Sequence, residues 1–209
     1  MNNKIDTVTQ NQLKVIQNEI LKSIYERRAV RKYSEKPVSM ELIDKLLRAG
    51  TMAPSALNLQ PWKFYVLTQK KDILEFSREI AKASEEGIRK SGLQGALKHF
   101  MDAPHTSELF ASEDPVFHGA PAVVFLTSPK DNEWGPLDVA MCAQNIMLAA
   151  HSVGLGTCPI GFAKYVGLTN IYSRLAIPES EHVNLAVTIG YSVDNPVFHE
   201  RQQNNRNFI

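Results

Sequence analysis

The chain has 209 residues, of which 44% are hydrophobic and 22% are charged, and its formal net charge is +1. These values are ordinary for a globular protein, and the length suits one domain with one hydrophobic core. A net charge near zero gives no long-range field that favours nucleic acid or a membrane surface. We therefore expect neither as a partner, and any charge cluster needs a local explanation.

The cysteines and histidines predict neither a disulfide framework nor a metal site. Cys142 and Cys158 fall in a predicted buried helix and the loop after it, which favours a reducing cytoplasm. The N-terminus lacks the apolar core of a signal peptide, and no segment approaches the roughly 20 apolar residues of a membrane span. The histidines show no metal-ligand spacing; His99, His105 and His118 could face a pocket, but surface positions are favoured.

The first elements are predicted to be helices. Apolar residues at helical spacing predict a helix over residues 10–28. Residues 1–24 are expected to form an N-terminal helical extension of the domain. Ser39 is placed to cap a second helix over residues 40–50, which Gly50 is expected to end.

The middle of the chain predicts two strands separated by a helix and an irregular stretch. Residues 62–68 are rich in aromatic and branched side chains, which is typical of a strand. An amphipathic helix follows over residues 70–90. Residues 91–118 show weak periodicity and predict a lid or a short-helix excursion. The apolar run 121–127 predicts a central strand.

The last third of the chain begins with the clearest helix, over residues 138–153, which is apolar nearly all round and is therefore expected to be buried in the domain core or in a subunit interface. We expect Asp138 to cap this helix and Gly154 to stop it. A short helix is predicted over residues 165–176, and a strand over residues 183–189.

A basic cluster follows the first helix, with four cations within residues 27–32. If the helix continued through the cluster, Arg27 and Arg31 would emerge on one face and could clamp the oxygens of a phosphate. The alternative interpretation is a solvated helix end, because charge runs are usually solvated.

Two further segments could approach a ligand. Residues 54–60 offer hydroxyl, amide and backbone groups that could bind a heterocycle, although turn chemistry alone also explains them. Residues 154–161 are glycine-rich, which permits a close approach of the backbone. They lack the spacing of a dinucleotide fingerprint and the Lys-Ser/Thr ending of a P-loop, and a helix C-cap with a loop explains part of the pattern.

Taken in order, four motifs resemble those of the nitroreductase family of FMN-dependent oxidoreductases. They are residues 27–33, 53–62, 143–157, and 176–178 with 189–191, all in register across roughly residues 25–201. The resemblance implies an α+β fold, in which helices flank a central mixed, mainly antiparallel sheet. It also implies an intertwined homodimer with two FMN sites at its interface.

The resemblance also implies the cofactor-binding residues. They are Arg27, Arg28, Ala29, Arg31, Pro54, Ser55, Ala56, Asn58, Pro159, Ile160, Gly161 and Arg201. By similarity, Arg27 would meet the FMN phosphate, Arg31 would reach the N1/O2 edge of the ring, and residues 54–58 would come from the other subunit. Residues 159–161 would present backbone N–H groups toward N5 and O4. Ala29 replaces the usual serine, and Arg206 is a second choice beside Arg201.

The implied activity is transfer of a hydride from NADH or NADPH, through flavin N5, to a nitroaromatic, quinone or similar small-molecule acceptor in ping-pong order. No side chain acts as catalyst in this scheme, since the chemistry takes place on the flavin. Three alternatives remain open: a flavin-fragmenting or reductive dehalogenating enzyme of the same fold, a non-enzymatic flavin-binding protein, and a plain anion-binding module. The sequence distinguishes neither the acceptor nor NADH from NADPH.

Overall fold

The computed structural model describes residues 18–91, 112–194, 196 and 201. At its centre is a four-stranded sheet in the order β1-β2-β4-β3. The strands are β1 (Lys63–Leu67), β2 (Ala122–Pro129), β4 (Glu181–Gly190) and β3 (Gly156–Ile160), and neighbours run antiparallel. The expected antiparallel character is thus confirmed. Within the described ranges, the parallel pairing is limited to an isolated bridge between Ala29 and Thr157.

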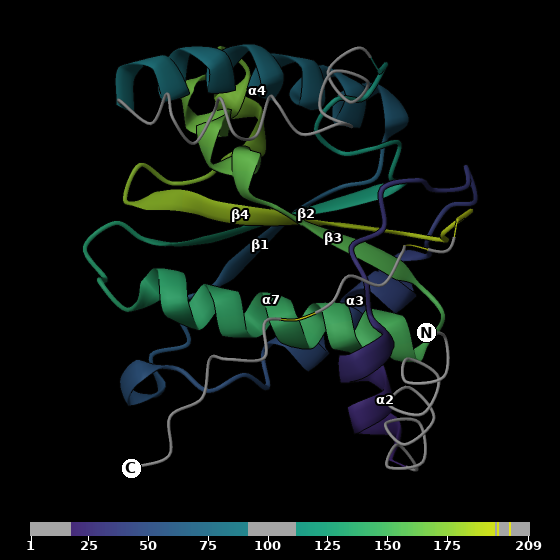
Figure 1. The fold of residues 1–209 in the computed structure, drawn as a ribbon. Helices are drawn as coiled ribbons and strands as arrows, with labels where there is room; N and C mark the ends of the chain where they lie inside the picture. Colours follow the sequence, from purple (N-terminus) through teal and green to yellow (C-terminus); the bar gives the residue numbers. More distant parts are fainter. Residues whose placement is uncertain (1–17, 92–111, 195, 197–200, 202–209) are drawn as a thin grey trace.

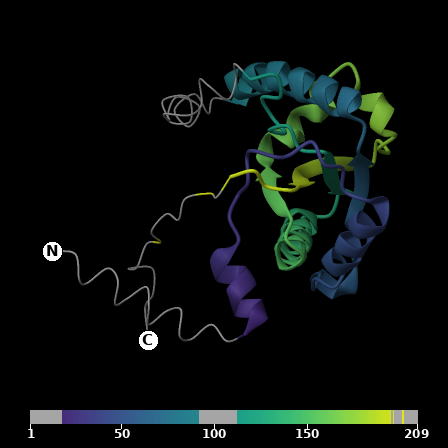
Figure 2. The same ribbon diagram turned by 90° about the vertical axis from the view of Figure 1, so that its right-hand side faces the viewer.

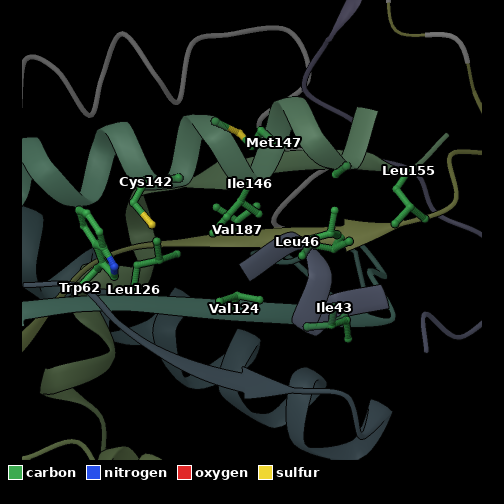
Figure 3. Packing of buried hydrophobic residues seen from close by; sticks show 14 of the residues in the cluster. Ile43, Leu46, Trp62, Val124, Leu126, Cys142, Ile146, Met147, Leu155 and Val187 are labelled. Atoms are coloured by element: carbon green, nitrogen blue, oxygen red, sulfur yellow. The ribbon is translucent and has the colours of Figure 1, made fainter. Parts of the chain in front are cut away.

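Helices cover both faces of this sheet, with α7 (Gly135–Ser152) and α3 (Met40–Gly50) on one face (Figure 1). The predicted Ser39 cap is confirmed, because its Oγ accepts a hydrogen bond from the Leu42 amide at 3.2 Å. Figure 3 shows the core of this layer, where side chains of α3 and α7 meet those of β2 and β4. The face of α7 that packs on the sheet is apolar, as expected, but Leu137 and Met141 are exposed by 58% and 38%, so the helix is not buried all round.

Gly50 has a different role from the one expected. It is the last residue of α3, and the following Thr51 is right-handed, so no left-handed glycine cap ends this helix. A Cβ at Gly50 would lie 2.6 Å from Cγ1 of Ile146. The glycine therefore permits the close packing of α3 on α7.

The other face of the sheet is covered by α4 (Lys70–Ser91) and two 3₁₀ helices, η2 (Gly161–Leu168) and η3 (Tyr172–Leu175). We expected one helix over residues 165–176, and that prediction is wrong. Arg174 ties η3 to α4 through Asp72 at 2.5 Å and Glu75 at 2.7 Å. These ion pairs hold η3 against α4.

The first described helix, α2 (Glu19–Glu26), packs on α7, which lies between α2 and α3 in Figure 2. It covers the second half of the predicted helix 10–28, whose first residues lie outside the described part of the chain. The predicted lid likewise falls mostly on residues 92–111, which the structure does not describe. Among the described helices, none is both long and apolar enough to cross a membrane.

Candidate functional site

The basic segment is extended rather than helical. α2 ends at Glu26, and Arg27 has backbone angles of φ −54° and ψ 131°. The segment then runs beside β3, where the Val30 amide donates to the Thr157 carbonyl at 2.9 Å. The expectation that Arg27 and Arg31 share a helical face is therefore wrong, because pairing with β3 replaces the last turn of the helix.

Both arginines nevertheless lie near one side chain of β3. Burial raises the pKa of the Cys158 thiol, while the positive charges of Arg31 and Arg27 act in the opposite direction. Both guanidinium groups must lie near this thiol to affect its pKa, and therefore near the same edge of the sheet. The two candidate phosphate-binding cations are thus brought to one place.

Strand β3 itself was predicted as a loop, and the structure corrects this. Gly156 and Pro159 give the segment little intrinsic preference for a strand, and its pairing with β4 supplies the stabilisation instead. A Cβ at Gly156 would lie 2.6 Å from Cγ2 of Val30. The glycine thus lets the basic segment pack directly against β3.

The loop of residues 112–121 reaches the same end of the sheet, as a row of paired residues across the strands shows. Ala122 of β2 pairs with Ile189 of β4, Ile189 pairs with Thr157 of β3, and Thr157 bridges to Ala29. The loop that enters β2, residues 112–121, therefore ends at the same end of the sheet as the basic segment.

Three buried side-chain polar atoms on the segments that meet here lack a hydrogen-bond partner among the described residues: Arg27 Nη1, His118 Nδ1 and Thr157 Oγ1. Buried polar groups are nearly always paired, so each exception requires an explanation. Their position at one end of the sheet indicates a binding site for a polar ligand.

The charge around Arg27 indicates an anion. Its pKa is lowered by burial first and then by the positive charges of Arg28 and Arg201. Arg28 is tied to the end of α2, since its Nη1 donates to the carbonyls of Tyr25 at 2.6 Å and Arg27 at 2.8 Å. A cluster of three guanidinium groups, one of them partly desolvated, matches the oxygens of a phosphate.

His118 corrects the expectation of a surface histidine. Its Nδ1 is fully buried, and the residue has a left-handed backbone with φ 61°. Burial lowers the pKa of His118 to about 4, Arg31 adds to the lowering, and Asp114 opposes it. The sequence favoured a surface position for His118 over one in a pocket, and it did not single out the Thr157 side chain because β3 was not predicted.

The loop of residues 54–60 lies apart from the basic segment, and its backbone is strained. Leu57, Asn58 and Gln60 have positive φ angles of 51°, 56° and 48°, which are uncommon outside glycine. Strain of this kind concentrates at functional sites. Within the loop, Ser55 Oγ accepts a hydrogen bond from the Gln60 amide at 3.0 Å.

Asp138 holds this loop against α7. Its carboxylate oxygens lie 3.1 and 3.3 Å from the Ala56 amide. The predicted capping role of Asp138 is wrong, because the N-cap position is Trp134 and Asp138 lies inside the first turn. Here the aspartate satisfies a loop amide rather than an amide of its own helix.

The two halves of the predicted site do not meet within one chain. The loop contacts the start of α7 at Asp138, whereas Arg27 and Arg28 lie near His151, at the end of α7 (Figure 1). At 1.5 Å per residue, these points are about 20 Å apart along the helix axis. The structure therefore gathers the predicted residues of the basic segment, of β3 and Arg201, but not Pro54, Ser55, Ala56 and Asn58.

A metal centre finds no support at either place. Among the residues that the structure describes, no group of three or more His, Cys, Asp or Glu side chains could hold a metal ion. The chemistry offered near β3 is instead a set of cations and neutral polar groups.

Comparison with known proteins identifies similar sequences. The model of the nitroreductase family matches residues 24–191. A putative NADH dehydrogenase/NAD(P)H nitroreductase of Archaeoglobus fulgidus is 30% identical over 188 residues, covering 87% of this chain and 90% of the relative. A 4-nitrobenzoate reductase of Pseudomonas putida is 29% identical, covering 81% and 83% of the two chains.

Solved structures share the fold. A nitroreductase with bound FMN from Bacteroides fragilis superposes with a TM-score of 0.73 at 24% identity, over 92% of this chain and 100% of that one. An FMN-bound nitroreductase from Desulfitobacterium hafniense gives 0.75 at 22% identity, over 93% and 100%. Since the family model covers most of the chain and a relative of nearly equal length is 30% identical, the chain belongs to the nitroreductase family.

Proposed function

We propose that the protein is an FMN-dependent NAD(P)H oxidoreductase that reduces a nitroaromatic, quinone or similar small molecule. The observation that carries the proposal is a set of three buried side-chain atoms that are unpaired within the described residues, Arg27 Nη1, Thr157 Oγ1 and His118 Nδ1, on segments that meet at one end of the sheet. A phosphate-bearing ligand with a polar ring would satisfy all three groups. The relatives named as nitroreductases and the FMN-bound structures of the family support this choice of ligand.

The residues present fit FMN. Arg27, beside Arg28 and Arg201, would hold the phosphate, and Arg31 would hold the polar edge of the ring. Backbone N–H groups at the end of β3, Ile160 and Gly161 among them, would face the ring, where Pro159 offers only its carbonyl. Bound there, FMN would supply two-electron chemistry, accepting a hydride from NADH or NADPH and passing reducing equivalents to the acceptor in ping-pong order.

The side chains would bind and orient rather than exchange protons with substrate. The cationic cluster would favour any negative charge that develops on the ring. The burial of Cys158 and Thr157 would keep water from this edge, which strengthens each hydrogen bond made there. No catalytic acid or base is proposed.

We further propose a homodimer in which residues 54–58 of one copy complete the site of the other. The 20 Å separation along α7 supports this, because a single chain leaves the two halves apart. Apolar side chains are exposed in and before the loop and on α2: Leu57 by 92%, Met52 by 75% and Ile20 by 69%. An open groove of about 580 Å³ between the loop and α7 is lined mainly by apolar atoms, including those of Pro54, Leu137 and Met141.

An apolar patch of this kind on a chain with no nucleic-acid or membrane signature fits a protein interface. The buried, unpaired cysteines Cys142 and Cys158 suit the cytoplasm, which we propose as the location.

A direct test is the absorbance spectrum of the purified protein, followed by oxidation of NADH and NADPH with separate acceptors. We expect the protein to show flavin absorption and to turn over with a nitroaromatic or a quinone. One relative, at 25% identity, is an iodotyrosine deiodinase of Thermotoga neapolitana, so a halogenated tyrosine belongs in the acceptor panel as the second candidate. Flavin binding without turnover would leave a non-enzymatic flavoprotein, and the absence of flavin binding would refute the proposal.

A further inference from the structure

His118 is a partly buried residue, and one of its ring nitrogens lacks a partner among the residues that the structure describes. Its Nδ1 is enclosed and lacks a hydrogen bond within the described part of the chain. A neutral imidazole carries one donor nitrogen and one acceptor nitrogen, and leaving either one buried and unpaired is costly. The histidine lies close enough to Arg31 for the arginine to affect its pKa, so it belongs to the same edge of the sheet.

The backbone at His118 is held in an unfavourable conformation. His118 and Gly119 both have positive φ angles, of 61° and 75°. Asp114, buried to all but 6% of its surface, binds the amides on either side of His118. One carboxylate oxygen accepts from Phe117 and the other from Gly119, both at 2.8 Å. Strain that is held so firmly from both sides usually serves a function.

The rest of the loop is anchored to the α4 face of the sheet. The Val116 amide donates to Ser77 Oγ at 3.0 Å, and the fully buried ring of Phe117 packs edge-on against Phe125 at 5.8 Å. These contacts leave the loop little freedom to turn His118 toward solvent. The imidazole is therefore positioned in advance, as binding groups need to be.

The charges at this edge of the sheet form two groups. Arg28 and Arg201 lie near Arg27, which gives a mainly cationic cluster suited to phosphate. His118 instead has Arg31 and Asp114 as charged neighbours, a set of mixed charge. Such a set suits the polar edge of a neutral or weakly charged heterocycle better than it suits a phosphate.

We propose that His118 is a further cofactor-binding residue, and that its Nδ1 forms a hydrogen bond with the polar edge of the flavin ring beside Arg31. This assignment rests on the proposed function and adds a residue that the sequence motifs did not include. The histidine acts as a fixed neutral partner that helps to orient the ring.

Two variants separate the hydrogen bond from the backbone strain. Both His118→Gly and His118→Asn tolerate a positive φ, but only asparagine keeps a polar atom near the position of Nδ1. Binding of FMN and of riboflavin to the apoprotein is measured by quenching of flavin fluorescence. Thermal unfolding of the same apoproteins reports on folding.

His118→Gly is expected to weaken the binding of both flavins by about fivefold to tenfold, the value of one neutral hydrogen bond. His118→Asn should bind within about twofold of the unmodified protein by the same reasoning. In the unmodified protein, the ¹⁵N resonance of His118 Nδ1 should shift when FMN is added, which a purely structural role would not cause.

Equal flavin affinity of His118→Gly and the unmodified protein would overturn this inference and leave the proposed function intact. So would an equal loss in both variants, an Nδ1 resonance that FMN does not move, or a loss confined to FMN, which would place the contact at the phosphate. Failure of the unmodified protein to bind FMN would overturn the proposed function itself.

Discussion

Substitution of Gly156 by alanine tests how the fold positions the basic segment. Gly156 lies in β3 without a positive φ, so alanine fits the backbone, and the loss of unfolded-state freedom alone would stabilise the protein by about 0.4–1 kcal/mol. The added Cβ would, however, lie 2.6 Å from Cγ2, 2.9 Å from Cβ and 3.0 Å from Cγ1 of Val30. Carbon atoms pack best at about 3.5–4.0 Å, so Val30 must retreat by about 1 Å.

Rotation of the Val30 side chain does not relieve this clash, because its Cβ is itself too close. Overpacking of a buried site costs about 1–3 kcal/mol, which exceeds the unfolded-state gain. We therefore expect a net loss of about 1–2 kcal/mol in the free energy of unfolding, measured by urea denaturation of the apoprotein. A shift of about 1 Å in the segment that carries Arg27 and Arg31 should also weaken FMN binding by about tenfold or more.

The double variant with Val30→Ala is the control, since it removes two of the three close contacts. The free energies should be non-additive by about 0.5–3 kcal/mol, with the pair more stable than the sum of the single changes predicts. A Gly156→Ala protein that is more stable than the unmodified one and binds FMN equally well would refute the reasoning.

Three other predictions concern the phosphate, the subunit interface and pH. Arg27→Ala should weaken FMN binding by about 10- to 100-fold, the value of a charge-assisted hydrogen bond, but leave riboflavin binding nearly unchanged, and an equal loss for both ligands would contradict the phosphate role. Leu137→Glu places a charge in the apolar groove and should shift sedimentation from dimer to monomer with loss of flavin, whereas Leu168→Glu, a similarly exposed leucine on η2, should do neither. Because the pKa of His118 is about 4 in the folded protein and near its ordinary value of 6.5 when unfolded, the unfolded state binds more protons as the pH falls through this window. The free energy of unfolding should then fall by up to about 3 kcal/mol between about pH 6.5 and pH 4, and His118→Asn should lose this part of the pH dependence; parallel curves for the two proteins would contradict it.

Periodicity and turn chemistry predicted the long elements well. The apolar faces of α3 and α7 and the apolar run of β2 are local patterns, and each corresponds to an observed element. β3 was missed because its glycine and proline give no strand signal, and its pairing with β4 involves residues about 30 positions away.

The candidate site was predictable only in part for the same reason. The arginines and the loop of residues 54–60 can be recognised in the sequence. The distance that separates them along α7 cannot, because it depends on the fold. The unpaired atoms of Thr157 and His118 depend on β3 and on the clamp of Asp114, which are long-range or conformational features. Asp138 resembled a helix cap, yet its partner is Ala56, 82 residues away.

The central claim is that each flavin site takes its basic segment from one copy and its 54–58 loop from the other. Subunit complementation tests it most directly, by mixing an Arg27→Ala/Arg31→Ala variant with a Ser55→Ala/Asn58→Gly variant after joint unfolding and refolding. Each variant alone should hold little FMN. In the mixture, dimers that pair one copy of each variant contain one intact site, so about one site in four should bind FMN with normal affinity. A mixture that binds no more FMN than the separate variants would contradict the claim.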